Sequence, residues 1–410
     1  MKRVAGTLAP QVATIAPVAV VTKGLVCGTG IGLAALQTAL ERGEPALQAN
    51  HFSTTPLPTH IGRIAALDDL RLPAHLAAWD CRATRAAWLG LQADGFGAAA
   101  QAAIQRHGAT RVGLVLGTSA STIGASELAY RSLAPDGGFP ADLRSETLNT
   151  LHAVTAFVQQ ALGVQGPCVT VSTACSSSAK AFAQAERWLR LELVDAVVVG
   201  GVDVLCESVL FGFQALGLVS PLPCQPFAAS RQGISVGEAA GFALLQRGPG
   251  ALQLIGHGEA NDAHHMSSPH PQGLGAERAL DEALARAGIA ASEVDYLNLH
   301  GTATPQNDAI EAALVARRYA PALHASATKG LTGHTMGAAG IVEALICLQA
   351  LETGLRSGSA GSPAADPAMG PLFAQQFKPE AVRAPVSVAA SHSFGFGGNN
   401  GVLLFGRGPA

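Results

Sequence analysis

Short apolar stretches alternate with helical patterns along most of the chain. The apolar stretches typical of buried strands are residues 18–21, 111–117, 167–173, 195–201, 252–258, 295–299 and 386–390. One helix is predicted from Leu33 to Arg42, and Phe182, Ala185 and Leu189 recur on one face of another. Strands that alternate with helices in this way predict an α/β fold.

The two ends of this pattern resemble each other faintly. The strand at 252–258, which runs into Gly256-His257-Gly258, echoes the opening strand and its turn at Gly28–Gly32. A chain of 410 residues also suits two fused halves better than one core. We therefore predict an N-terminal half of residues 1–250 and a C-terminal half of residues 251–410.

Gly28-Thr29-Gly30-Ile31-Gly32 has a second interpretation, as a dinucleotide-binding turn. Such a turn needs an acidic residue at the end of a second strand at the proper distance, and none stands there. The pattern favours a tight connection between a strand and a helix.

The composition adds an expectation about assembly. Charged residues make up 13% and hydrophobic residues 48% of the chain, whereas an average domain has about 25% charged residues. So few charges predict that much surface is buried in a partner, as in a large homodimer, although an alanine-rich coding bias would give the same numbers. The net charge of −3 gives no global field that favours nucleic acid.

Seven scattered cysteines without a CxxC pair indicate neither a zinc site nor a disulfide framework. Met1-Lys2-Arg3 precedes a mildly apolar stretch that Pro10 and Pro17 interrupt, so we expect no signal peptide. We also expect no segment that spans a membrane, and a cytoplasmic location.

Four motifs carry the candidate chemistry. They are Ser172–Ser178 around Cys175, His300–Pro305, Thr332–Gly340 around His334, and Gly395–Asn400. Together they supply one thiol, two imidazoles and a glycine-rich loop. This set can take up an acyl group as a thioester and then form a carbon–carbon bond to it.

Cys175 is the predicted nucleophile. It follows a β-rich run and precedes a helix, and the positive end of a helix dipole favours a thiolate. A buried, inert thiol is the ordinary alternative, and we keep it for the other six cysteines: Cys27, Cys81, Cys168, Cys206, Cys224 and Cys347.

His300 and His334 are the predicted donors. Either alone would more often be structural, but together with the cysteine they can donate hydrogen bonds through Nε2 to a thioester oxygen. Glu343 stands in an apolar helical run, where a carboxylate is costly unless paired, and Lys329 is its predicted partner.

In this order, the four motifs resemble the β-ketoacyl-acyl-carrier-protein synthases, the condensing enzymes of fatty-acid and polyketide synthesis, over about residues 18–405. The resemblance implies a thiolase-like, five-layer αβαβα sandwich of two similar halves. It also implies an acyltransferase in which Cys175 holds an acyl group. Malonyl-acyl carrier protein loses carbon dioxide and is joined to that acyl group. Acyl carrier protein is then a partner, and no metal or redox cofactor is expected.

The resemblance further implies roles for single residues. Lys329 and Glu343 would orient the active-site network, and Thr302 and Thr304 would bind the phosphopantetheine arm. The amides of Cys175 and Phe396 would form an oxyanion hole, and Phe396 would gate the acyl tunnel. Gly395 and Gly397 would let the backbone approach the substrate, and residues 262–267, with Ser267, would form a second mobile loop.

His264, His265 and His270, with Asp262, could instead suggest a metal site. Their spacing fits no standard arrangement of ligands, so we favour the mobile loop.

The chain departs from the family at several places. It has Gln225-Pro226-Phe227-Ala228 and Arg231-Gln232-Gly233-Ile234 where the family usually has Arg-Pro-Phe-Asp and Arg-Asp-Gly-Phe. The arginine lost at Gln225 predicts altered carrier docking, for which we name Arg82, Arg85 and Arg131 as candidates by rough position.

The small side chains of residues 117–121 predict an altered acyl pocket, suited to a rigid or unsaturated chain. With Cys175–Lys180, they resemble the condensing enzymes of bacterial aryl-polyene pigment clusters.

Three alternatives were weighed. A coenzyme A-dependent thiolase would have a second cysteine in the last motif, and Ser391–Gly395 offers none. The condensing enzymes with a single histidine use asparagine with cysteine and histidine, whereas this chain has His334 as a second histidine. A chain-length-factor subunit typically lacks the nucleophile, so Cys175 argues against it, although a heterodimer with a related subunit stays open beside the homodimer.

Overall fold

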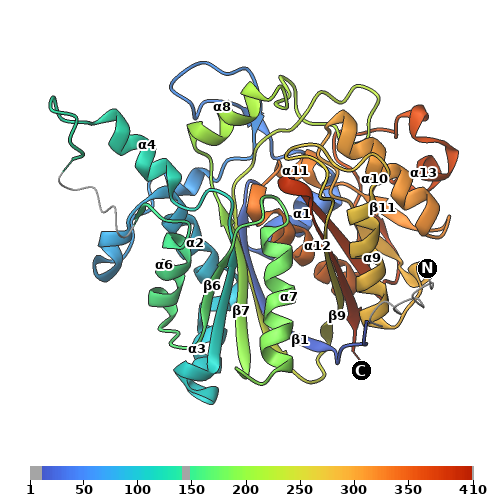
Figure 1. The fold of residues 1–410 in the computed structure, drawn as a ribbon, viewed down its shortest axis with the longest axis horizontal. Helices are drawn as coiled ribbons and strands as arrows, with labels where there is room; N and C mark the ends of the chain where they lie inside the picture. The colour runs from blue at the N-terminus through green and yellow to red at the C-terminus, as the bar shows by residue number, and fades with distance from the viewer. Residues whose placement is uncertain (1–11, 141–147, 409–410) are drawn as a thin grey trace, which may run out of the picture.

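Two mixed β-sheets form the framework of the computed structural model, which describes residues 12–140 and 148–408 (Figure 1). Met1–Arg3 and Pro10, which bear on the signal peptide, lie outside the described residues. The first sheet contains β1 (Val18–Cys27), β2 (Gly30–Ile31), β5 (Val112–Gly117), β6 (Cys168–Val171), β7 (Ala196–Asp203) and β8 (Ala239–Arg247). The second contains β9 (Leu252–Asn261), β10 (Tyr296–Asn298), β11 (His324–Ser326), β14 (Val388–Gly395) and β15 (Asn399–Arg407).

The two sheets repeat one topology. Their strand orders are β2-β1-β8-β7-β5-β6 and β9-β15-β14-β10-β11. In the first sheet β1, β8 and β7 pair antiparallel and β7, β5 and β6 pair parallel. In the second sheet β9, β15 and β14 pair antiparallel and β14, β10 and β11 pair parallel. Apart from β2, each strand of one sheet has a counterpart in the other, and residue 250 falls between β8 and β9.

Helices complete five layers. Between the sheets lie α7 (Ser177–Arg190) and α12 (Ala339–Thr353), whose side chains share one core cluster with strands of both sheets. A second cluster packs α2 (Arg82–Gln92), α3 (Phe96–His107) and α6 (Ala153–Leu162) on the outer face of the first sheet. A third packs α9 (Leu274–Ala287) and α10 (Pro305–Arg318) on the second. The fold is the predicted αβαβα sandwich.

The two middle helices differ in sequence. The predicted face of α7, formed by Phe182, Ala185 and Leu189, is fully buried. Helix α12 is apolar nearly all round and is buried on every side up to Leu351. With its preceding turn it forms an 18-residue stretch, Met336–Thr353, that is long and apolar enough to cross a membrane. The sequence was expected to hold no such stretch, but 89% of this one is buried, as in a core helix.

The remaining elements are short. The helices are α1 (Leu33–Arg42), α4 (Ile123–Arg131), α8 (Glu207–Ala215), α11 (Lys329–Thr332) and α13 (Pro371–Gln376), and the strands are β3 (Gln48–Ala49), β4 (His60–Ile61), β12 (Leu355–Arg356) and β13 (Val382–Arg383). The predicted bounds of α1 are confirmed. The glycine turn before it is a hairpin in which Cys27 pairs with Gly30, the structural connection that the sequence favoured.

Candidate active site

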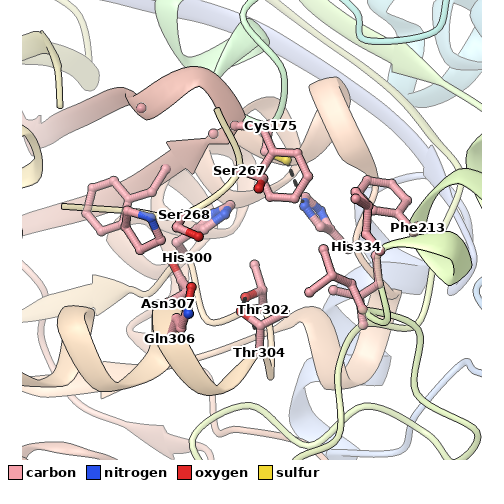
Figure 2. Close-up of a pocket in the computed structure, with 18 of the residues that line it drawn as sticks. Cys175, Phe213, Ser267, Ser268, His300, Thr302, Thr304, Gln306, Asn307 and His334 are labelled. Atoms are coloured by element: carbon pink, nitrogen blue, oxygen red, sulfur yellow. Dashed lines mark hydrogen bonds between the residues drawn. The ribbon is translucent and has the colours of Figure 1, made fainter. Parts of the chain in front are cut away.

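Cys175 lies in the turn between β6 and α7. The residue before it, Ala174, has a φ of 52°, a left-handed conformation that is uncommon outside glycine and that clusters at functional sites. The Ser177 amide donates to the Ala174 carbonyl at 3.1 Å and closes the turn. This places the sulfur in a cavity of about 390 Å³ that His300 and His334 also line (Figure 2).

His334 lies in the corresponding turn of the second half, between α11 and α12. Its Nε2 is 3.0 Å from the Cys175 sulfur. The Met336 amide donates to Nδ1 at 3.2 Å, so the ring proton resides on Nε2 and points at the sulfur. The backbone of His334 bonds to the first half, because its amide donates to the Ser235 carbonyl and its carbonyl accepts from the Gly237 amide.

His300 follows β10 and faces His334, with 5.5 Å between the ring centroids. The ammonium group of Lys329 lies 3.3 Å from Nδ1 of His300 and also donates to the His300 carbonyl and to Glu343. Three acceptors thus satisfy its three protons. Since Nδ1 accepts, the proton of His300 also resides on Nε2. The predicted partnership of Lys329 and Glu343 is present in the structure.

Burial controls the charges of this site. Burial and the Lys329 ammonium lower the pKa values of His300 and His334 well below the usual range, so both rings are neutral donors. Burial raises the pKa of Cys175 to about 12. This effect of burial opposes the thiolate that the helix end is predicted to favour. Burial also raises the pKa of Glu343 to about 7, against the pull of Lys329.

The same three groups invite a test as metal ligands. The sulfur and one nitrogen from each histidine lie within 4.8 Å of one another. Ligation needs a free lone pair on nitrogen, but both Nε2 atoms carry protons while both Nδ1 atoms accept hydrogen bonds. The site is built to donate to an oxygen. Within residues 12–140 and 148–408, His264, His265 and His270 form no group of potential metal ligands.

The far wall of the cavity is polar. Thr302 and Thr304 lie across it from Cys175 (Figure 2), with their hydroxyl oxygens 2.8 Å apart. Ser267 and Gly395, both predicted to contact substrate, line the cavity as well. Gly397, predicted with them, is exposed and lies outside the lining.

The glycine-rich turn after β14 lies against the nucleophile. A side chain at Gly395 would come within 3.1 Å of the Cys175 amide, so only glycine allows this approach. Phe396 lines the cavity and packs on Phe213 of α8, with 6.0 Å between centroids. The Gly397 amide donates to the Met266 carbonyl at 2.7 Å. The predicted second loop thus contacts the predicted gate.

Buried carboxylates that the motifs did not reveal hold the histidine loop. Glu311 on α10 accepts the amides of His300 and Gly301, each at 2.8 Å, and contacts Nδ1 of His392 at 3.1 Å. Asp308, one turn earlier, accepts the Thr302 amide at 3.1 Å. The signal was in the sequence: two acids three residues apart lie on one helix face, directly after the His300 motif.

Asp203, at the end of β7, does the same for the first half. Its carboxylate accepts the amides of Ser119 and Ala120 at 2.8 and 2.9 Å. It also accepts the Gly337 amide at 2.7 Å and so connects this loop to the turn that carries His334. Nothing near Asp203 in the sequence pointed to these distant amides.

The segments that depart from the family pattern are held by internal contacts. Gln225, which replaces the family's arginine, donates to the Gly361 carbonyl at 2.8 Å, and Arg231, which matches the family, pairs with Asp366 at 2.7 Å. Of the predicted docking residues, Arg82 is bidentate to the buried Glu238 at 2.5 and 2.7 Å. That pairing does not support a docking role for Arg82.

Arg85 and Arg131 are also paired, with Asp80 and Glu207 respectively. Together with Arg82 they line a second cavity, of about 600 Å³. Ser121 also lines this second cavity, whereas no residue of the 117–121 loop lines the first. Ser121 therefore borders a space apart from the nucleophile, and the loop does not form the wall of the cavity that holds Cys175.

Comparison with known proteins matches both halves of the chain to one family. Residues 81–251 match the family described as beta-ketoacyl synthase, N-terminal domain, and residues 253–361 match beta-ketoacyl synthase, C-terminal domain. Nodulation protein E of Rhizobium meliloti (strain 1021) is 34% identical over 313 residues, which cover 72% of this chain and 76% of that protein. The 3-oxoacyl-[acyl-carrier-protein] synthase 2 of Staphylococcus aureus is 29% identical over 323 residues, covering 75% and 79% respectively.

Solved structures show the same likeness. A chain from the complex of the ketosynthase ApeO with its chain length factor ApeC, from Xenorhabdus doucetiae, superposes with a TM-score of 0.83 at 31% identity. The superposition covers 98% of this chain and 100% of that one.

Proposed function

The chain belongs to the β-ketoacyl synthase family of condensing acyltransferases, and from that premise we propose that Cys175, His300 and His334 carry its reaction. The observation that supports this assignment is the convergence of two Nε2–H donors beside one sulfur. The condensation depends on substrates carried by acyl carrier protein. No metal or redox cofactor enters the proposed cycle, because the thioester already activates the acyl carbon.

In the first half-reaction, the Cys175 sulfur attacks the thioester carbonyl of an acyl carrier protein. The carbonyl oxygen gains negative charge and accepts hydrogen bonds from the backbone amides of Cys175 and Phe396. The carrier's sulfur then leaves with the proton that the Cys175 thiol gives up. The acyl group is now a thioester of Cys175.

In the second half-reaction, the thioester oxygen of malonyl-acyl carrier protein accepts Nε2–H of His300 and of His334. The bond to the carboxylate breaks, carbon dioxide leaves, and the electron pair becomes an enolate that the two donors stabilise. The enolate carbon attacks the Cys175 thioester. Collapse of the tetrahedral intermediate expels the Cys175 sulfur, which takes a proton from solvent, and releases the β-ketoacyl carrier protein. We assign the binding of the phosphopantetheine arm to Thr302 and Thr304, because both line the cavity.

Intact-mass measurement tests this function. The protein is incubated with a panel of acyl carrier proteins, and a chymotryptic map locates any added acyl group. Loading of Cys175 is expected, followed by release of a β-ketoacyl product when malonyl-acyl carrier protein is added. Loading of another residue, or product formation by Cys175→Ala, would contradict the assignment.

The chain-length-factor role remains the second candidate, because one of the similar structures pairs a ketosynthase with such a factor. The 3.0 Å contact between Cys175 and His334 favours the catalytic subunit, since a subunit that only shapes a partner has no use for it. A chain-length factor would load no acyl group in the mass experiment, with or without a second subunit.

We also propose a dimer, either of two copies or with a related subunit. Strand β6 lies at the edge of the first sheet, where its backbone groups can pair with another chain. In the same half, α4 and the segment after it expose Leu128, Tyr130 and Phe139, at 64, 65 and 49%. Light scattering of the chain alone and with the products of neighbouring genes distinguishes the two assemblies.

The finer assignment that we propose is polyene synthesis. The chain has 31% identity to a chain of the ApeO–ApeC complex. Faster loading of unsaturated than of saturated acyl groups of equal length would support this assignment, and the reverse would contradict it.

A further inference from the structure

Lys180 is a half-buried cation in the helix that begins after the nucleophile. Its ammonium group donates a hydrogen bond to Asn399 Oδ1 at 3.2 Å. Its stem runs along β15, where a side chain at Gly401 would lie 3.8 Å from Lys180 Cγ. Lys180 therefore connects the helix of the first half to the strand that follows the gate in the second half.

The amide of Asn399 extends this connection to the gate. Its Nδ2 donates to the carbonyl oxygen of Phe396 at 3.1 Å. A lysine has donors and no acceptor, so the oxygen end of the asparagine must face Lys180 and the nitrogen end must face Phe396. Lys180 thereby fixes the orientation in which Asn399 can hold the turn.

The other contacts of this turn act on different residues. Asn261 donates to the Gly397 carbonyl at 2.8 Å, and the Asp262 amide donates to the Gly398 carbonyl at 2.9 Å. Among the described residues, the Asn399 amide is the side chain that bonds to the Phe396 carbonyl. Gly397 and Gly398 have φ values of 74° and 70°, and glycines leave a turn free to move unless something holds it.

The position of Lys180 is costly, which argues that it is used. Burial and the neighbouring Arg187 lower its pKa, and the carboxylate of Glu259 opposes them. Glu259 itself pairs with Arg187. Within the described ranges no carboxylate forms an ion pair with Lys180, and its recorded hydrogen bond is the one to Asn399. A partly buried charge that serves a single neutral acceptor is unusual on stability grounds alone.

We propose that Lys180 is a positioning residue that holds Phe396 through Asn399 and thereby sets the rate at which Cys175 is acylated. This role rests on the proposed function, because it places the Phe396 amide beside the reacting carbonyl. Without the ammonium group the asparagine can rotate, the turn loosens, and the oxyanion donor is less often in place.

Three variants test the relay. Lys180→Met keeps the stem and removes the donor, Lys180→Arg restores a donor, and Asn399→Asp keeps an acceptor for Lys180 but cannot donate to Phe396. We expect Lys180→Met and Asn399→Asp to slow acylation of Cys175 from acyl carrier protein by about tenfold. Lys180→Arg should recover most of the loss. The double variant should be no slower than either single variant.

Two controls separate positioning from general damage. Alkylation of Cys175 by iodoacetamide needs no oxyanion hole, so its rate should stay within about twofold in every variant. Arg187→Met removes a cation beside Glu259 without touching the turn, and it should acylate normally.

Three outcomes would overturn the role of Lys180 and Asn399 alone. They are acylation of Lys180→Met at the wild-type rate, additive losses of rate in the double variant, and an equal loss of rate in Arg187→Met. If acyl carrier proteins do not load even the wild type, the proposed function itself is wrong, and this role is wrong with it.

Discussion

The two halves of the molecule place different chemistry at the same point of one topology. In the first half, β6 leads through Cys175 into α7. In the second, β11 leads through His334 into α12. Both turns contain a non-glycine residue with positive φ, Ala174 at 52° and Met336 at 55°. A duplicated fold thus brings two equivalent turns face to face, and one supplies the nucleophile while the other supplies a donor.

A second pair of connections shows the same division. The loop after β5 and the loop after β10 are each held by buried carboxylates that accept backbone amides, Asp203 in the first half and Glu311 with Asp308 in the second. The first loop carries no titratable group, whereas the second delivers His300. Both halves thus use buried carboxylates to hold a loop at the site, while both imidazole donors come from the second half.

The largest expected effect on activity comes from removing the thiol of Cys175, which the first half supplies. Cys175→Ala should abolish elongation, because no acyl group can be held. Decarboxylation of malonyl-acyl carrier protein should persist, because His300 and His334 are unchanged. Product mass and carbon dioxide release measure the two steps separately. Loss of both steps would show that the halves do not divide the chemistry in this way.

Next in size is the ion pair behind the donors. Lys329→Met leaves Glu343 buried without its partner and should lower the free energy of unfolding by about 3–5 kcal/mol. Arg383→Met is the control, because Arg383 and its partner Glu41 are 57% and 39% exposed, and it should cost at most about 1 kcal/mol. Denaturant unfolding measures both. Equal losses would mean that burial of the pair is not what matters.

The donors of the second half come third. His300→Ala and His334→Ala each remove one donor and should slow decarboxylative condensation by roughly 10²- to 10³-fold, the usual cost of one oxyanion donor. Acylation of Cys175 should change far less, because it relies on backbone amides. Rapid-quench measurement of each step checks this. A histidine variant that fails at acylation instead would place that ring in the first half-reaction.

The last prediction concerns pH, where the expected change is about tenfold for each unit. Since burial raises the pKa of Cys175 to about 12, the thiolate fraction should rise about tenfold per pH unit below that value. Iodoacetamide alkylation between about pH 7 and 10 should follow this slope. A plateau already near neutral pH would show that the helix end and His334 outweigh desolvation.

The sequence contained the functional residues but only part of what holds them. The four motifs located Cys175, His300 and His334, because each motif sets its side chain in a short connection between two elements by local rules. The pairing of Lys329 with Glu343 followed from one charge in an apolar helix. The motifs needed only near neighbours along the chain, and the pairing needed one match between Lys329 and Glu343.

What could not be predicted depends on contacts between distant segments. Asp203 acts on amides of another loop, and the role of Asn399 appears only when Lys180 of the other half lies beside it. The thiolate expectation left out an opposing effect for a related reason. A helix end is visible in the sequence, whereas the burial that opposes it is a property of the assembled sandwich.

The shared middle layer has a consequence for motion. Because α12 packs in one core cluster with α7 and with strands of both sheets, the halves cannot slide without disrupting that shared core. We expect shape changes during turnover in the segments that line the cavity outside this core, namely the glycine turn and the loop that contacts it. Substrates should therefore displace the glycine turn and its contacting loop while the two sheets and the helices between them keep their positions.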